Sequence, residues 1–233
     1  MALVSVVLYG VDYMVFGRAG EIGFGLLGNL AFLPIYVLFV TLMIEKILKQ
    51  RERESLRQKL NMVVGVFFSE VGTPMLKACR GFVKESPELL GVFKVTPQWK
   101  PDDYQRSIDY LQQHEIHVNS RAGDLEALKS FIVARRTFML GLLENPTLLE
   151  HDEFTDLLWA VFHLLEELES RHSLVGLPDN DLDHLSGDIK RAYGHLLRVW
   201  VTYMHHLQRD YPYLFSLAVR LNPLDPAAKA ELA

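Results

Sequence analysis

The stretch FGLLGNLAFLPIYVLFVTLMI, residues 24–44, decides the organisation of this chain. Its 21 residues carry no charge. As an α-helix they extend about 31 Å, which matches the ~30 Å hydrocarbon thickness of a bilayer. The alternative is a core helix of a soluble protein, but both the length and the basic residues that follow argue against it. We therefore predict one transmembrane helix over residues 21–45. Pro34 should kink this helix but not end it.

Basic residues cluster directly after this stretch. The segment EKILKQRERESLRQK, residues 45–59, contains six Lys and Arg, whereas only Arg18 precedes the apolar stretch. The cytoplasmic flanks of membrane helices are enriched in Lys and Arg. The asymmetry predicts a single-pass protein of the cell (inner) membrane, with a basic juxtamembrane helix over residues 46–60 and a cytoplasmic C-terminal domain. Because these residues attract anionic headgroups, the lipid bilayer is an expected partner.

The first 17 residues, MALVSVVLYGVDYMVFG, are apolar but short for a membrane span. They include Asp12, and no basic segment precedes them, so they do not resemble a secretory signal peptide. We interpret residues 1–20 as an apolar segment that lies at the membrane interface or spans it partly. The alternative is a second, tilted span in a hairpin that turns through residues 18–21, which places both chain ends on one side of the membrane.

The rest of the chain predicts an all-α soluble domain over residues 61–222, followed by a tail at 223–233. Apolar residues recur at helical spacing, and the sequence shows neither strand-like alternation nor a hairpin turn. We expect a bundle of five or six helices. The first has Met62, Val63, Val66, Phe67 and Val71 on its buried face. The helical segments cover residues 59–84 with a restart at Thr73-Pro74, and residues 102–118, 124–143, 151–171, 182–209 and 213–221.

Charge and cysteine content exclude some functions. Residues 61–233 carry 17 Lys and Arg against 24 Asp and Glu. A nucleic-acid-binding domain needs a basic face to neutralise phosphates, so nucleic acid is not an expected partner. The chain has one cysteine, Cys79, which cannot form an internal disulfide and is expected to be a buried structural thiol.

Three sequence blocks carry a resemblance to known proteins: KLNMVVGVFFSEVGT at 59–73, LLENPTLLEHDEFTDLLWAVFHLLEEL at 142–168 and YPYLFSLAVRLNP at 211–223. With them, the chain from residue 24 onward resembles an uncharacterised family of bacterial single-pass membrane-anchored all-helical proteins. The resemblance implies an anchor followed by a helical domain. It implies no activity, cofactor or catalytic residue.

The richest cluster of metal-ligating side chains lies within residues 163–172. Helical spacing places His163 near Glu166 or Glu167, and Glu169 near His172, so each pair could share a helix face. The candidate metal ligands are therefore His163, Glu166, Glu169 and His172. A di-metal carboxylate site normally needs Glu-x-x-His on two helices, and only Glu169 and His172 match well; Asp181-x-x-His184 is a weaker match at a helix start. The competing interpretation is an ordinary solvated helix face, and no cofactor is predicted.

A second unusual feature is an acidic surface. No Lys or Arg occurs between Arg136 and Arg171, and acids are frequent from Glu144 to Glu169. Such a surface could dock a basic partner or the basic juxtamembrane helix. The alternative is that these acids stabilise a helix N-terminus and keep the domain soluble.

Two functions fit this sequence. The first is a membrane-anchored helical module for interaction or regulation, or an accessory subunit, which has a protein partner or forms a homo-oligomer and is not an enzyme. The second is a metal-dependent enzyme with a di-metal carboxylate and histidine site in the helical bundle. Catalytic motifs such as a phosphate-binding glycine loop or a nucleophile elbow are absent from the sequence, which favours the first function.

Overall fold

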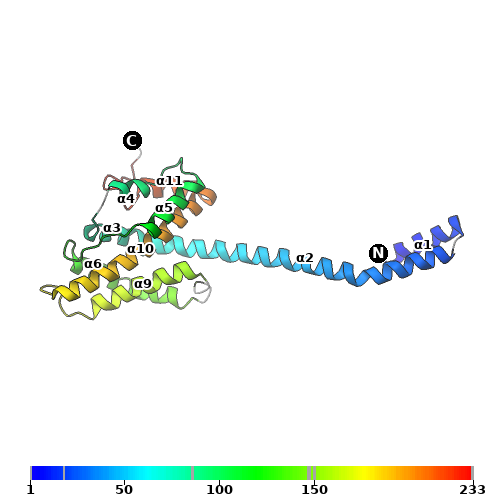
Figure 1. The fold of residues 1–233 in the computed structure, drawn as a ribbon, viewed down its shortest axis with the longest axis horizontal. Coiled ribbons are helices and arrows are strands. Elements are labelled where there is room, and N and C mark those ends of the chain that lie inside the picture. The colour runs from blue at the N-terminus through cyan, green and yellow to red at the C-terminus, as the bar shows by residue number, and fades with distance from the viewer. Residues whose placement is uncertain (1, 18, 85–86, 146–147, 149–150, 232–233) are drawn as a thin grey trace. The chain divides into compact units, whose positions relative to one another are not determined.

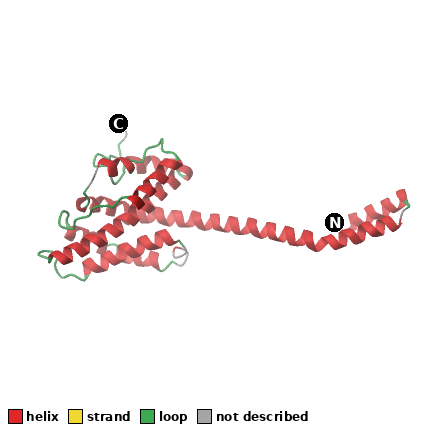
Figure 2. Cartoon of the chain, in the orientation of Figure 1, coloured by secondary structure: helices red, strands yellow, loops and turns green. Residues whose placement is uncertain are grey.

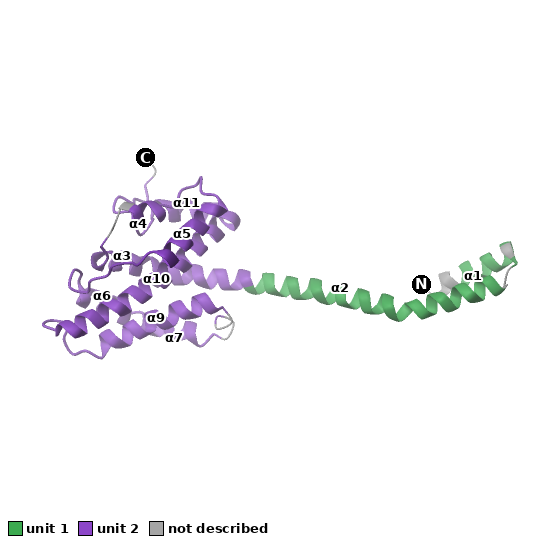
Figure 3. Cartoon of the chain, in the orientation of Figure 1, with its two compact units in different colours: residues 1–56 green, residues 57–233 purple. Residues whose placement is uncertain are grey.

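The computed structural model describes residues 2–17, 19–84, 87–145, 148, 151–231. Helices make up almost all of the regular structure in these ranges (Figure 2), and their only β-type pairing is an isolated bridge between Val83 and Val118. The expected all-α class is confirmed. The chain divides into two compact units, residues 1–56 and residues 57–233 (Figure 3).

The first unit contains α1 (Ala2–Phe16) and most of α2 (Ala19–Phe67). Gly17 has a φ of 63°, a left-handed conformation that favours glycine, and here the chain reverses. Helix α1 therefore folds back alongside the start of α2 (Figure 1), where Asn29 Nδ2 donates a hydrogen bond to the Tyr9 hydroxyl at 3.0 Å. This geometry is that of the hairpin alternative; its position in a membrane stays a prediction.

Helix α2 continues through Pro34, as expected for a kink that does not end the helix. Its apolar stretch is long and apolar enough to cross a membrane, and none of that stretch is buried inside the protein. Leu30, Phe32 and Phe39 are among the large apolar side chains that point outward. In water these apolar side chains would be exposed to solvent. The helix therefore has the composition of a transmembrane helix, and it is not buried as a core helix of a soluble protein would be.

The second unit is built around two long helices. These are α9 (Asp152–Glu169) and α10 (Asp179–Asp210), which pack against each other and are joined by a short loop (Figure 1). In that loop Gly176 has a φ of 73°, which permits the tight reversal. The His151 side chain caps α9 by accepting from the Phe154 amide at 3.3 Å, and the acidic first turn complements the helix dipole.

Shorter helices cover this pair. They are α3 (Thr73–Cys79), α4 (Pro87–Val92), α5 (Pro101–Gln113), α6 (Leu125–Val133), α7 (Arg136–Leu143) and α11 (Pro212–Arg220). Helices α5, α11 and α3 pack on α10, and helices α6 and α7 pack on α9. The predicted single helix over residues 124–143 is therefore two helices, and α4 lies between residues 84 and 102, where no helical segment was predicted.

A π-helical turn, Phe68–Gly72, connects α2 to α3. Both Phe67 and Phe68 are buried here: Phe67 packs edge-on against Phe154, and Phe68 stacks on Tyr203 with ring centroids 5.2 Å apart. Gly72 is required because a Cβ would lie 2.5 Å from the Phe68 ring. A turn of this kind is typical of a helix that is adjusted locally for packing.

The buried face of α2 differs from the prediction. It consists of Leu60, Val64 and Phe67 in α2 and continues through Phe68 and Val71 of the π-helical turn; Phe67 and Val71 were expected there. Met62 and Val66, which were expected inside, are 58% and 52% exposed. Apolar residues occupy two neighbouring stripes of this helix, and the stripe that holds both phenylalanines provides the larger apolar area for burial.

Candidate functional site

Only one of the four predicted metal ligands lies in a cluster of ligating groups. His163 projects from α9 toward α10, whereas Glu166 is exposed and His172 is exposed beyond the end of α9. Glu169 instead forms an ion pair with Arg136 of α7, with Oε2 and Nη1 2.5 Å apart. The structure therefore does not bring the four together.

A different group of four forms across the two long helices. His163 and Glu167 are one turn apart on α9, and His184 and Asp188 are one turn apart on α10. Each of the four contributes a ligand atom, and these atoms all lie within 4.8 Å of one another. Among the described residues this is the one group of at least three His, Cys, Asp or Glu side chains that meets this criterion. We call it the α9–α10 cluster.

The distances within the α9–α10 cluster run both along and between the helices. His163 Nε2 lies 3.9 Å from Glu167 Oε1 on its own helix and 3.5 Å from Asp188 Oδ1 on the other. His184 Nε2 lies 3.2 Å from Asp188 Oδ2 and 3.5 Å from Glu167 Oε2. Each imidazole therefore faces both carboxylates.

Arginines balance the charge of these carboxylates. Arg171 Nη1 donates to Glu167 Oε2 at 2.7 Å, and Arg171 Nη2 donates to Asp181 Oδ1 at 3.3 Å. The hydrogen bond from Arg171 is the main reason that the pKa of Glu167 is lowered. Arg191 Nη1 donates to Asp188 Oδ1 at 3.1 Å. Glu167 is thus held ionised beside the imidazoles.

The sequence contains a pattern, different from Glu-x-x-His, that indicates this cluster. The pattern His-x-x-x-acid occurs at His163 with Glu167 and again at His184 with Asp188, on the two helices that flank one short loop. Residues at i and i+4 lie on one helix face, so two such pairs on adjacent helices can meet. Helical spacing left Glu166 and Glu167 as alternative neighbours of His163, and the ligand set took Glu166; in the structure Glu167 is the residue that lies near His163.

A second feature of the domain is an apolar hollow of roughly 690 Å³. We call it the α2–α11 groove. Its lining comes from the end of α2, the π-helical turn, α3, the end of α10 and α11, and includes Met62, Val66, Phe68, Tyr203, Leu214 and Leu217. Tyr203 closes over Gly65, where an added Cβ would lie 3.2 Å from the Tyr203 hydroxyl. Ligand and partner sites often have this size and apolar lining.

Polar groups mark the margin of the α2–α11 groove. Asn61 Nδ2 lies 3.1 Å from His206 Nδ1, and that nitrogen lies 2.8 Å from Asp210 Oδ2. Burial lowers the pKa of His206, and the attraction of Asp210 only partly offsets this effect. Lys77 also lines the groove and is exposed to solvent.

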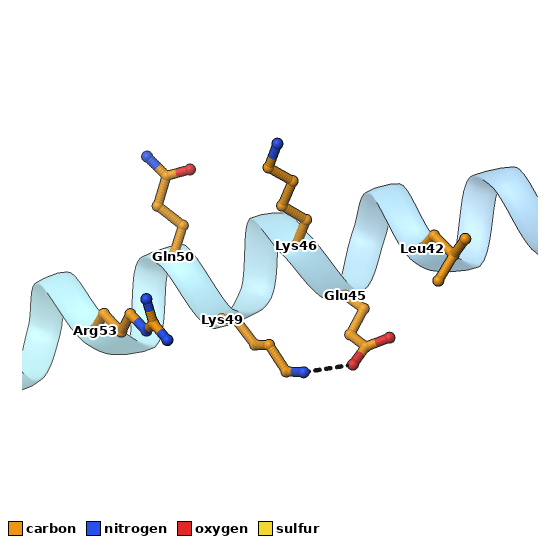
Figure 4. A pocket seen from close by; sticks show the side chains of 6 residues that line it. All are labelled: Leu42, Glu45, Lys46, Lys49, Gln50 and Arg53. Atoms are coloured by element: carbon orange, nitrogen blue, oxygen red, sulfur yellow. Dashed lines mark ion pairs between the residues drawn. The ribbon is translucent and has the colours of Figure 1, made fainter.

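Two other places of interest do not form enclosed sites. A surface depression on α2 is lined by side chains of a single helix, among them Lys46, Lys49 and Arg53 (Figure 4). Glu45 and Lys49 form an ion pair of 2.7 Å there, and Figure 4 shows Lys46 and Gln50 extending from the other side of the helix. Cys79 is fully buried, as expected, and burial raises the pKa of its thiol to about 12, which makes it unreactive.

These observations define an all-helical protein with an apolar pair of N-terminal helices and a larger C-terminal helical domain. The chain belongs to the MJ1433 family. Residues 56–220 match the family described as "Uncharacterized protein MJ1433, C-terminal helical domain", and residues 1–48 match "MJ1433, N-terminal helical domain".

A relative in the archaeon Methanocaldococcus jannaschii, "Uncharacterized protein MJ1433", is 42% identical over 226 residues, which cover 97% of this chain and 90% of the relative. No solved structure matches the chain. The expected resemblance to a helical family is confirmed. Because this relative is archaeal, the expectation of a bacterial family is not supported.

Proposed function

We propose that the protein is a membrane-anchored helical interaction module. In this proposal the apolar part of α2 spans the cell membrane, the basic residues 46–59 lie on the cytoplasmic side, and the C-terminal domain binds a protein partner. The uncharged segment 24–44 and the six basic residues within 45–59 support the anchor and its orientation. No catalytic motif competes with this interpretation in the sequence.

The observation that carries the interaction function is the α2–α11 groove. Most large apolar side chains of the domain are buried, yet Met62, Val66, Leu214 and Leu217 remain exposed around one hollow. Contiguous exposed apolar surface on a soluble domain marks binding sites more often than chance. The groove lies between helices, so it resembles the surfaces that receive the apolar face of an amphipathic helix.

The charge at the groove indicates what such a helix carries. Lys77 lines the groove from α3 and is exposed, and His206 has a lowered pKa and is mostly neutral near pH 7. We therefore infer that the partner is a protein whose amphipathic helix presents apolar residues to the groove and an acidic residue to Lys77. A second copy of this chain is the competing occupant.

Site-specific photo-crosslinking in membranes of the producing cells tests this function. A photo-reactive residue at Val66 should crosslink to one protein other than the chain itself, and Lys77→Glu should reduce the yield. The same residue at Trp159, an exposed apolar side chain on α9 outside the groove, is the matched control. Crosslinks of equal yield from both positions, or a product of twice the mass of the chain, would contradict the proposal; the second result would assign the groove to homo-oligomerisation.

The metal-dependent enzyme is a second candidate function, favoured only by the α9–α10 cluster. This cluster offers four ligand atoms around one point, whereas the di-metal arrangement would use carboxylates and histidines from four helices. A single-ion site is therefore the form of metal chemistry that the cluster supports.

A further inference from the structure

We propose that the α9–α10 cluster binds one divalent transition-metal ion through His163, Glu167, His184 and Asp188. This inference is independent of the proposed interaction function, since none of the four residues lines the α2–α11 groove. It uses two imidazole nitrogens and two carboxylate oxygens. Zinc, iron and manganese sites in proteins are commonly built from this donor set.

The spacing of the donor atoms fits a common ion. Zinc binds nitrogen and carboxylate oxygen at about 2.0–2.2 Å, so two neighbouring donors of a tetrahedral site lie roughly 3.3–3.6 Å apart. The contacts to the two carboxylate oxygens that no arginine binds are 3.2 Å, from His184 Nε2 to Asp188 Oδ2, and 3.9 Å, from His163 Nε2 to Glu167 Oε1, and one ligand atom from each of the four residues lies within 4.8 Å of the others. One contact is close to the tetrahedral spacing, and the other donors would have to move inward by side-chain rotation to close around one ion.

A buried carboxylate oxygen gives independent support. Asp188 is only 3% exposed, yet its Oδ2 has no hydrogen-bond partner among the described residues. His184 Nε2 approaches this oxygen to 3.2 Å at an ion-pair distance, without the geometry of a hydrogen bond. Leaving a buried carboxylate oxygen unpartnered costs free energy, and a coordinated cation would remove that cost.

The surrounding arginines leave the required oxygens available. Arg171 bonds to Glu167 Oε2 and Arg191 bonds to Asp188 Oδ1, so each carboxylate keeps its other oxygen, Glu167 Oε1 and Asp188 Oδ2, for an ion. Hydrogen-bonded partners of this kind orient metal-binding carboxylates. The side chains of His163 and His184 are 44% and 53% exposed, which gives an ion access from solvent.

The position of the cluster predicts a structural consequence. Its ligands come from both α9 and α10, close to the loop that joins them. An ion bound to both helices would hold this helical hairpin together, and because the unfolded chain lacks the assembled site, binding would stabilise the fold. The competing interpretation is a cluster of ion pairs between imidazolium groups and carboxylates, which needs no metal.

Metal titration of the full-length protein distinguishes the two. The protein is purified in detergent without a histidine tag, stripped with a chelator and titrated with Co²⁺, whose visible spectrum reports a low-coordinate nitrogen and oxygen site, and then with Zn²⁺ in competition. We expect one ion per chain and a higher unfolding temperature in the metal-bound protein. His184→Ala and Asp188→Asn should weaken binding by at least about 100-fold, since loss of an outer-shell partner alone costs 10–100-fold.

His172→Ala is the matched control, because His172 is an exposed histidine just beyond α9 that does not belong to the cluster. It should bind like the unmodified protein. His184 is more than half exposed, so its removal should leave the helical circular dichroism spectrum unchanged and keep the test independent of folding. Far less than one ion per chain in the unmodified protein, or equal loss of binding in His172→Ala and His184→Ala, would overturn the proposal and leave an ion-pair cluster only.

Discussion

The two compact units of this chain differ in how far their apolar side chains are exposed. In residues 1–56, large apolar residues such as Leu30 and Phe39 point outward and nothing in the unit covers them. In residues 57–233, residues of the same type, such as Phe154 and Leu196, are fully buried between helices. In the proposed membrane-anchored module, lipid is the solvent of the first unit and water that of the second, and the hydrophobic effect then accounts for both.

Of the changes considered, charged substitutions in the apolar stretch should have the largest effect, which is a loss of membrane association. We expect the double variant Leu30→Arg/Phe39→Arg to lose most of its membrane association, because each arginine near the centre of a span costs about 2.5–3.5 kcal/mol of insertion free energy. Fractionation of cell lysates with quantitative immunoblotting measures the change. The variant Leu30→Ala/Phe39→Ala should remain in the membrane fraction. Equal fractionation of the two variants would show that charge in this stretch does not control membrane association.

Truncation of a core ring should affect only the second unit. Phe154 is fully buried and packs edge-on against Phe67, with ring centroids 5.3 Å apart. Phe154→Ala should lower the free energy of unfolding by about 3–5 kcal/mol. All three tryptophans lie in the second unit, so denaturant unfolding followed by tryptophan fluorescence in detergent reports that unit alone. Phe39→Ala is the control and should leave this transition unchanged.

Two valines on α2 allow the effect of burial on stability to be compared within one helix. Val64 is buried at 5% exposure, and Val66 lies in the α2–α11 groove at 52% exposure. We expect Val64→Ala to lower the free energy of unfolding by about 1–2 kcal/mol, since it removes buried methyl groups, and Val66→Ala to change it by less than about 0.5 kcal/mol. The same unfolding assay measures both. If Val66→Ala were the more destabilising variant, the assignment of the buried stripe would be incorrect.

Acidification should produce the smallest effect, again confined to the second unit. Burial lowers the pKa of His195 and of His205 below the usual value of a histidine side chain. The unfolded chain therefore binds protons at a higher pH than the folded domain does, so stability is full above about pH 7 and falls as the pH drops below it. The variant His195→Gln/His205→Gln should show a shallower loss of stability between about pH 7 and pH 5. An unchanged slope would mean that these groups do not contribute.

The fold class and the apolar stretch could be predicted from the sequence because both depend on composition and period. The boundary between α10 and α11 at residues 209–212 follows a local signal, Pro212. The start of α9 at Asp152 likewise follows the acidic residues of its first turn. The buried stripe at the end of α2 was predicted in part: Phe67 and Val71 are buried as expected, but Met62 and Val66 lie on a neighbouring apolar stripe that is exposed, and only the packing of the domain chooses between the two stripes.

The break between α6 and α7 coincides with a tertiary contact. No proline or glycine marks this position, but Arg135 Nε donates to the Glu70 carbonyl of the π-helical turn at 2.7 Å, and its guanidinium stacks over Phe131. A carbonyl in that turn thus finds its partner in a residue 65 positions away, which no local pattern reveals. The expected helix over residues 124–143 is interrupted there.

The candidate metal site was predicted in part. His163 is the one predicted ligand that belongs to the cluster. Glu166 was chosen over its alternative Glu167, Glu169 forms an ion pair with Arg136, and the two ligands from α10 depend on how that helix packs. A single helix can bring two ligands to one face; the other two require knowledge of the neighbouring helix. The α2–α11 groove likewise depends on the packing of α11 against α10, and sequence alone gives no position for it.

Sedimentation of the unmodified full-length chain tests the central claim most directly. After cell lysis without detergent, an alkaline carbonate wash and high-speed centrifugation, the protein should be found in the membrane pellet and should enter the supernatant only when detergent is added. Recovery of the chain in the supernatant without detergent would show that lipid is not the solvent of residues 24–44, and the membrane-anchored module would have to be abandoned.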